Sequence, residues 1–133
     1  MTSFTGSCMC NQLKFSFTGE PKQTAICHCV QCQKLSGSAF TYNLLVDRED
    51  FKWTSGEPKT GSFVQESGIY IQYFFCPDCG TIIFKQTEEK ADLRPFAIVQ
   101  AGTVDGYDTK RKPDVEFWVS RKADWVQPIP GVP

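Results

Sequence analysis

The sequence predicts a single, mainly β domain with antiparallel pairing, and three features of the chain support this. Apolar residues mostly alternate with polar ones, as in strands that bury one face. Short segments rich in β-branched and aromatic residues recur along the chain. Gly, Pro and Asp turn signals lie between these segments. Because 133 residues leave room for one modest core, we expect residues 1–133 to form one domain.

The first predicted strand shows the clearest alternation. Leu13, Phe15 and Phe17 are separated by polar residues, which is the pattern of a half-buried strand. The turn-forming sequence Gly-Glu-Pro at 19–21 ends it. This segment therefore contributes three large side chains to the predicted core.

Later segments complete the predicted sheet structure. Strands are expected at residues 39–46, 69–75, 81–84, 96–101 and 115–119. Turn signals at 54–58, 102 and 105–106 separate them. Helix is expected only as one turn after Cys29 and another at 47–51, where an Asp is able to cap a single turn. The Pro-rich end, from about residue 127, is expected to be loosely ordered.

Charge and hydropathy exclude several classes of partner. The chain has 14 basic and 15 acidic residues and a net charge of -1, which does not favour binding to nucleic acid or to an anionic membrane. No apolar run approaches the roughly 20 residues of a membrane span. The first residues show neither a basic segment nor an apolar signal segment. We therefore expect a soluble protein in the cytoplasm, where thiols stay reduced.

Seven cysteines in three tight groups point to metal. The groups are Cys8 with Cys10, then Cys27, Cys29 and Cys32, then Cys76 with Cys79. A disulfide framework normally needs a secreted chain and an even cysteine count. Seven thiolates instead match one closed four-cysteine zinc site and one open three-cysteine site.

The last cysteine group has the form of a zinc knuckle. Cys76 and Cys79 are two residues apart, and Gly80 permits the close turn that follows. Spacing does not decide which pair completes the tetrahedron, because Cys29 with Cys32 suits a zinc ribbon as well as Cys8 with Cys10 does.

Motifs over nearly the whole chain resemble one known family. They are Gly-Ser-Cys-Met-Cys at 6–10, Cys-His-Cys at 27–29 with Cys32, Ser-Gly-Ser-Ala-Phe at 36–40, Phe-Cys-Pro-Asp-Cys-Gly-Thr at 75–81, Ala-Gly-Thr-Val-Asp at 101–105, Phe-Trp-Val-Ser at 117–120 and Asp-Trp-Val at 124–126. Together they resemble the glutathione-dependent formaldehyde-activating enzyme family, also called the centromere protein V type domain.

The resemblance implies two zinc ions, a fold and an activity. It implies a structural zinc on Cys8, Cys10, Cys76 and Cys79, and a second, catalytic zinc on Cys27, Cys29 and Cys32. The implied fold is a compact set of antiparallel sheets similar to methionine sulfoxide reductase B and to a Rab-binding exchange factor. The implied activity is a carbon–sulfur lyase reaction with glutathione as cosubstrate and formaldehyde as the carbonyl compound.

The ligand types of the second site restrict its chemistry. Three thiolates around Zn²⁺ leave a net charge near -1, so a bound water is acidified less than at a three-histidine site. A soft sulfur suits the open position better. We therefore expect a small-molecule thiol or thiol adduct as substrate, such as S-hydroxymethylglutathione. A larger carbonyl or thioether metabolite remains an alternative.

The proton donor and the glutathione contacts are less well defined. His28, Glu116, Tyr42 and Tyr73 are acid or base candidates by residue type. Glu116 stands where many relatives carry a His. Since His28 lies between two ligands in an extended segment, it should point away from their metal and act beside the site or on the surface.

Ser36, Gly37 and Ser38 offer backbone amides for a carboxylate of glutathione, and Lys34 or Arg48 offers charge. The alternative is a tight loop with solvated cations, as also expected for the basic run at 110–112. Trp53, Trp118 and Trp125 are expected in the core or the wall of the site.

Other function classes match less well. A zinc deaminase requires His-x-Glu, and His28 is followed by Cys29 and Val30. A methionine sulfoxide reductase of type B requires a late nucleophilic cysteine, and none follows Cys79. The remaining rival is a non-catalytic, zinc-stabilised module that binds glutathione or a protein. The sequence does not predict the oligomeric state.

Overall fold

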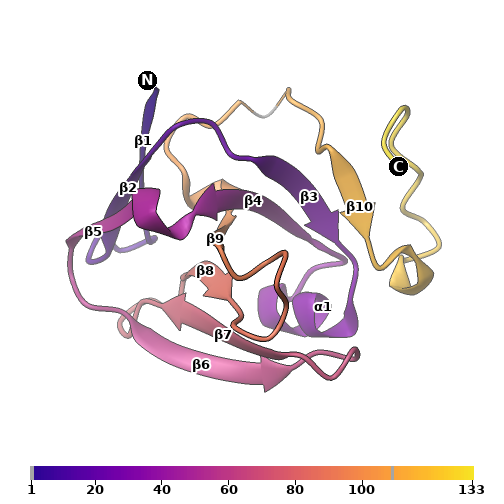
Figure 1. Ribbon diagram of the computed structural model, residues 1–133, viewed down its shortest axis with the longest axis horizontal. Helices are drawn as coiled ribbons and strands as arrows, with labels where there is room; N and C mark the ends of the chain where they lie inside the picture. Colours follow the sequence, from indigo (N-terminus) through magenta and orange to yellow (C-terminus); the bar gives the residue numbers. More distant parts are fainter. Residues whose placement is uncertain (1, 109) are drawn as a thin grey trace.

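The computed structural model describes residues 2–108 and 110–133, which form ten strands and one short α-helix (Figure 1). A three-stranded antiparallel sheet has the order β1-β2-β5. Its strands are β1 (Ser3–Ser7), β2 (Lys14–Thr18) and β5 (Phe51–Ser55).

The second sheet has seven strands in the order β10-β3-β4-β9-β8-β7-β6. The strands are β3 (Gln23–Cys27), β4 (Thr41–Asp47), β6 (Lys59–Val64), β7 (Tyr70–Phe75), β8 (Ile82–Gln86), β9 (Phe96–Gln100) and β10 (Val115–Phe117). All neighbours are antiparallel except β10 and β3, which are parallel. The helix is α1 (Val30–Ser36), and the 3-10 turns are η1 (Arg48–Asp50), η2 (Ala101–Thr103) and η3 (Val119–Arg121).

The mainly β prediction is confirmed. The six predicted strands correspond to β2, β4, β7, β8, β9 and β10, and the two predicted helical turns correspond to α1 and η1. The strands β1, β3, β5 and β6 were not predicted. The pattern of β6 explains this, because Lys59–Val64 is mostly exposed and polar and so shows little apolar alternation.

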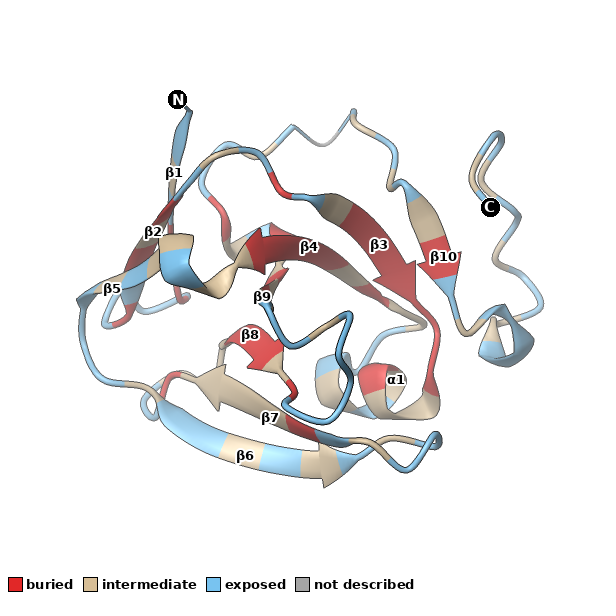
Figure 2. Ribbon diagram, viewed as in Figure 1, coloured by how far each residue is buried: buried red, intermediate tan, exposed pale blue. Residues whose placement is uncertain are grey.

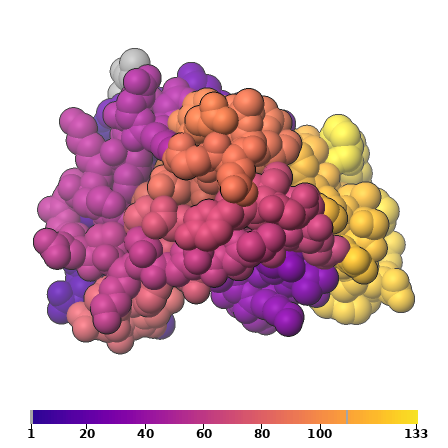
Figure 3. Space-filling model, turned by 60° about the horizontal axis from the view of Figure 1, so that its bottom comes forward, coloured from indigo at the N-terminus to yellow at the C-terminus, as the bar shows by residue number. Residues whose placement is uncertain are grey.

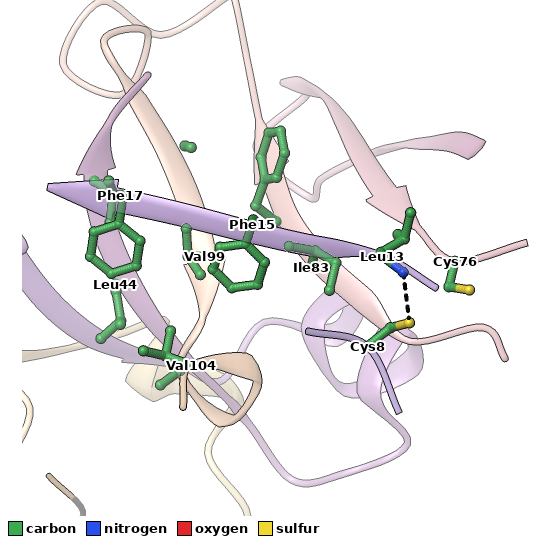
Figure 4. Close-up of a cluster of buried hydrophobic side chains, with 13 residues drawn as sticks. Cys8, Leu13, Phe15, Phe17, Leu44, Cys76, Ile83, Val99 and Val104 are labelled. Carbon is green, nitrogen blue, oxygen red and sulfur yellow. Dashed lines mark hydrogen bonds between the residues drawn. The ribbon is translucent and has the colours of Figure 1, made fainter. Parts of the chain in front are cut away.

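The main core lies between the two sheets (Figures 2 and 4). Leu13, just before β2, and Phe15 and Phe17 of β2 are each at most 1% exposed. They meet Leu44 of β4 and Val99 of β9 from the larger sheet. Burying one such side chain contributes about 2 kcal/mol. The main core therefore covers one face of the larger sheet, and the smaller sheet does not cover the opposite face.

Aromatic contacts reinforce this core. The rings of Phe15 and Phe51 stack 5.2 Å apart, and those of Phe74 and Phe84 stack 4.3 Å apart. Trp53 also packs against the core, as expected. Trp125 is 74% exposed, so its prediction as core or site wall is wrong. Its segment at 123–126 forms a turn on the surface, which leaves the indole nothing to pack into.

The C-terminal segment lies beside β10 and α1 at one end of the molecule (Figures 1 and 3). The Pro133 carbonyl accepts a hydrogen bond from the Glu116 backbone N–H, 3.0 Å away. Lys112 Nζ donates to the Pro130 carbonyl at 3.1 Å. In the part of the chain that the structure describes, no helix is both long and apolar enough to cross a membrane.

Candidate metal centres and adjoining pocket

Four cysteines from two distant segments meet at one end of the core. The Sγ atoms of Cys8, Cys10, Cys76 and Cys79 all lie within 4.8 Å of one another. The Cys8–Cys10 and Cys10–Cys76 sulfur pairs are each 3.6 Å apart. Tetrahedral zinc with Zn–S bonds of about 2.3 Å places its sulfurs about 3.8 Å apart, whereas a disulfide is about 2.05 Å long. These four donors therefore fit one zinc ion, and we call them the four-cysteine cluster.

Tight turns hold the four-cysteine cluster. The Leu13 N–H donates to Cys8 Sγ at 3.3 Å, which closes the loop between β1 and β2 (Figure 4). Gly80 has a φ of 79°, a left-handed conformation that glycine adopts freely, and its N–H donates to the Cys76 carbonyl at 2.9 Å. The Thr81 hydroxyl lies 3.2 Å from Cys79 Sγ and lowers the pKa of that thiol to about 5. A thiol that ionises readily is a ready metal ligand.

A second group of three cysteines lies where β3 leads into α1. Cys27 ends β3, and Cys29 and Cys32 flank the first turn of the helix. Cys29 Sγ accepts a hydrogen bond from the Cys32 backbone N–H at 3.2 Å and so caps α1. The three Sγ atoms lie within 4.8 Å of one another, and all three residues are buried. We call them the three-cysteine cluster.

The three sulfurs influence one another strongly. Contacts with Cys29 and then Cys32 raise the pKa of Cys27. Hydrogen bonds from Cys27 and Cys29 lower the pKa of Cys32 to about 2, and the Lys85 ammonium adds to this. One of the three thiols thus ionises much more readily than the others, and a bound cation would favour the ionised form of all three, as in a metal-ligand set.

Lys85 is a buried cation beside these sulfurs. Its Nζ lies 3.5 Å from Cys32 Sγ, and the residue is only 5% exposed. A buried ammonium needs a partner of opposite charge, and the Cys32 thiolate provides it. Gln65 Nε2 lies 3.6 Å from Cys29 Sγ on another side of the cluster.

A pocket of about 560 Å³ opens beside the three-cysteine cluster. Cys27, Cys32 and Lys85 form part of its wall, as do Phe117, the last residue of β10, and Trp118, which follows it. Trp118 has a φ of 58°, which is uncommon for a residue with a side chain. The strand residues of the wall come from the face of the larger sheet that turns away from the main core. The cluster therefore lies at a cavity large enough for a small molecule.

His28 and Glu116, two predicted acid or base candidates, form a buried pair. The His28 Nε2 to Glu116 Oε1 distance is 2.8 Å, and Lys122 Nζ lies 3.0 Å from the same oxygen. Burial works to raise the pKa of Glu116, but the hydrogen bonds from His28 and Lys122 outweigh it and lower that pKa. His28 is fully buried and does not join the cluster of its neighbours Cys27 and Cys29. The alternative of a surface position is therefore wrong, because β10 and Phe40 cover the ring.

The remaining predicted contacts lie outside the pocket wall. The loop at 36–38 uses its polar groups locally, since Ser36 Oγ donates to the Cys32 carbonyl and accepts from the Ser38 N–H. Lys34, in the last turn of α1, is absent from the wall. Arg48 Nε and Nη2 donate to the carbonyls of Phe96 and Thr87.

The two tyrosine candidates are also absent from the wall. Tyr42 packs against Tyr107 with ring centroids 6.3 Å apart, and Tyr73 lies between Phe63 and Phe75. The basic run at 110–112 includes Arg111, which lies near Glu20 and Asp114 on the surface.

Sequence reasoning missed Lys85, Gln65 and the apolar residues of the pocket. A lysine in a strand usually faces solvent, so Lys85 gave no signal. The sequence also did not predict that His28 pairs with Glu116, although both residues were named as acid or base candidates. It depends on the parallel contact of β10 with β3, in which Glu116 lies opposite Ile26.

The family of the chain follows from comparison with known proteins. Residues 3–121 match the family described as glutathione-dependent formaldehyde-activating enzyme. The chain belongs to this family. The match includes both cysteine clusters, the pocket and Lys85.

Individual relatives are more distant. A protein of Podospora anserina, whose name provisionally calls it a glutathione-dependent formaldehyde-activating enzyme, is 28% identical over 104 residues. The alignment covers 74% of this chain, and the chain spans about half the length of that relative (48%). A crystal structure of a structural-genomics protein from Rhodobacter sphaeroides is similar with a TM-score of 0.58 and 15% identity, over 80% of this chain and 92% of that one. This second likeness concerns the fold alone.

Proposed function

We propose that this chain is a zinc-dependent carbon–sulfur lyase acting on glutathione or a glutathione–carbonyl adduct such as S-hydroxymethylglutathione. The observation that supports it is the three-cysteine cluster at the pocket. Among residues 2–108 and 110–133, no fourth Cys, His, Asp or Glu joins this cluster. A purely structural zinc site is normally closed by a fourth protein ligand. Family membership supports the choice of glutathione.

The two clusters have different proposed roles. Cys8, Cys10, Cys76 and Cys79 would hold a structural zinc, and Cys27, Cys29 and Cys32 would hold a second zinc. When bound at three thiolates, zinc offers a position suited to a further sulfur and stabilises that sulfur as a thiolate. The pocket then holds the substituent that the sulfur carries.

Lys85 is the proposed positioning residue for the substrate. Its ammonium has three hydrogens, and one of them points at Cys32 Sγ. The others are available to a hydroxyl oxygen on the carbon next to the substrate sulfur. In the cleavage direction the carbon–sulfur bond breaks, its electron pair goes to sulfur, and the hydroxyl proton leaves as the carbonyl forms. That proton returns to the sulfur or to solvent, so no oxidant or reductant is needed.

His28 and Glu116 have a structural role in this proposal. Neither residue belongs to the pocket wall, and each is already hydrogen-bonded to the other. They hold the backbone of Cys27 against β10. We also propose a reducing compartment, because none of the seven cysteines forms a disulfide. We also propose that the fold is similar to those of methionine sulfoxide reductase B and Rab-binding exchange factors.

Metal analysis with a glutathione titration tests the function. Elemental analysis of the purified chain should give about two zinc ions, and Cys32→Ser about one. Glutathione added to the cobalt-substituted chain should change the thiolate-to-cobalt absorption, and Cys32→Ser should lose that response. Ser3→Ala, at an exposed position of β1, is the control. A single tightly held metal whose absorption does not change when glutathione is added would instead support a non-catalytic, zinc-stabilised binding module.

A further inference from the structure

The pocket extends far beyond the three-cysteine cluster. Its wall follows β3 from Cys27 back to Gln23, a distance of about 13 Å at about 3.3 Å per residue. Gln23 lies opposite Leu45 of β4, which in turn lies opposite Ile98 of β9. The far end of the pocket is therefore built on three adjacent strands.

The wall between these ends is mainly apolar. Ten of its nineteen residues are aliphatic or aromatic. They include Leu45, Phe63, Ile71, Phe96 and Ile98, from four strands of the larger sheet.

The buried polar residue Asn43 does not change this character. Its Nδ2 donates to Thr41 Oγ1, and its Oδ1 accepts from Gln100 Nε2, each at 3.0 Å. Its side chain is thus occupied within the protein. At the rim, Lys90 is paired with Asp92 at 3.1 Å, and Lys22 lies 3.8 Å from Asp47. The interior consequently offers few free polar groups to a ligand.

This interior is larger and more apolar than either half of S-hydroxymethylglutathione requires. A single hydroxymethyl carbon fills little of about 560 Å³. The peptide part of glutathione carries amides and carboxylates, which lose free energy when buried without hydrogen-bond partners. An apolar chain, by contrast, gains from each buried methylene.

We propose that the substrate is a thiol adduct whose carbonyl part carries a long apolar substituent, which lies along Leu45 and Ile98. This rests on the proposed lyase function and specifies its substrate class. The reaction is then R–CH(OH)–S–G giving R–CHO and G–SH: the carbon–sulfur bond breaks, its electron pair goes to sulfur, and the hydroxyl proton is transferred to that sulfur. The peptide part of the thiol stays at the mouth of the pocket in contact with water.

Non-cleavable analogues test the inference without requiring turnover. Titration calorimetry on the purified full chain compares S-methylglutathione with S-hexylglutathione. The hexyl compound should bind at least about tenfold more tightly, because several additional methylenes are buried. Ile98→Thr should reduce this ratio by about threefold or more. Val64→Thr, on an exposed position of β6 outside the wall, should leave the ratio unchanged.

Two results would overturn the inference. Equal affinity for the methyl and hexyl compounds would do so, as would a hexyl preference that Ile98→Thr leaves intact. Circular dichroism of each variant keeps a folding defect apart from a binding defect. Cleavage of the glutathione adducts of formaldehyde and of hexanal is measured separately. Cleavage of neither adduct is failure of the lyase proposal, whereas equal cleavage of both is failure of this one.

Discussion

The imidazole of His28 and the carboxylate of Glu116, 88 positions apart in the sequence, are 2.8 Å apart in the fold and almost fully buried. They join the end of β3, beside the three-cysteine cluster, to β10. Lys122 Nζ, 3.0 Å from the same carboxylate, extends the contact to the segment after η3. The pair therefore fixes the parallel strand that brings Phe117 and Trp118 to the pocket.

Glu116→Ala should destabilise the fold by about 3 kcal/mol, because it leaves a buried imidazole and a mostly buried lysine without their acceptor. Glu116→Gln keeps an acceptor oxygen and should cost about half as much. Urea unfolding of both variants measures this. The control is Glu57→Ala at an exposed site, expected within about 0.5 kcal/mol of the parent chain. Equal stability of Glu116→Ala and the parent would contradict the role of the pair.

The contact of Glu66 with Arg121 should make one wall of the pocket sensitive to pH. Arg121 Nη2 lies 2.7 Å from Glu66 Oε2, which links the turn between β6 and β7 to η3. The hydrogen bond from Arg121 lowers the pKa of Glu66 below its ordinary 4.5. For a carboxyl with a lowered pKa, the stabilisation is present above the unfolded-state pKa and is lost as pH falls through the folded value.

Hydrogen exchange of residues 65–69 measures this effect. Exchange protection of the turn should therefore be higher at neutral pH and decrease below about pH 4.5. Glu66→Gln should therefore show less protection of the turn than the parent at neutral pH, whereas the two chains should be alike at low pH. Comparing the two chains at each pH cancels any common loss of metal. An unchanged pH profile in Glu66→Gln would refute the assignment.

Lys85→Met should separate function from stability. The variant keeps the length of the side chain and removes a buried charge. Because zinc on the three-cysteine cluster would balance the Cys32 thiolate, stability of the zinc-loaded chain should stay within about 1 kcal/mol. Binding of glutathione and cleavage of its adducts should fall by about tenfold or more, because a charge-assisted hydrogen bond is lost. Thermal unfolding and kcat/KM together measure this.

Lys85→Arg keeps the charge and should recover part of the activity, whereas Lys52→Met, on the exposed face of β5, should change nothing. Full activity of Lys85→Met would show that the ammonium near Cys32 has no role in the reaction.

The alternation of Leu13, Phe15 and Phe17 was enough to predict β2 and its contribution to the core, because local pattern and burial agree there. The cysteine spacing was enough to predict that the cysteines gather in clusters able to hold metal. It did not decide which pair completes the knuckle, since Cys8 reaches Cys76 only through sheet packing.

The pocket was beyond sequence reasoning for a related reason. Ile98, Leu45 and Gln23 align through the register of three strands, and a lysine such as Lys85 becomes buried only when that sheet curves around it. Long-range pairing of this kind leaves no local pattern to read.

The two cysteine clusters should respond differently to loss of one sulfur. Cys76 is fully buried in the main core, so Cys76→Ser should remove a structural ion together with core packing. We expect a decrease in melting temperature of about 10 °C or more, or failure to fold. Cys32→Ser removes a sulfur at the pocket wall and should leave a folded chain that keeps one zinc.

Cys10→Ser separates metal loss from packing loss, because Cys10 belongs to the four-cysteine cluster but is exposed. If the ion itself holds the β1–β2 loop to the β7–β8 turn, Cys10→Ser should destabilise the fold far more than Cys32→Ser. Differential scanning calorimetry gives the melting temperatures of all three variants, and zinc analysis gives the number of ions that each one keeps. Similar melting temperatures for Cys10→Ser and Cys32→Ser would mean that the clusters do not divide into a structural and a reactive site.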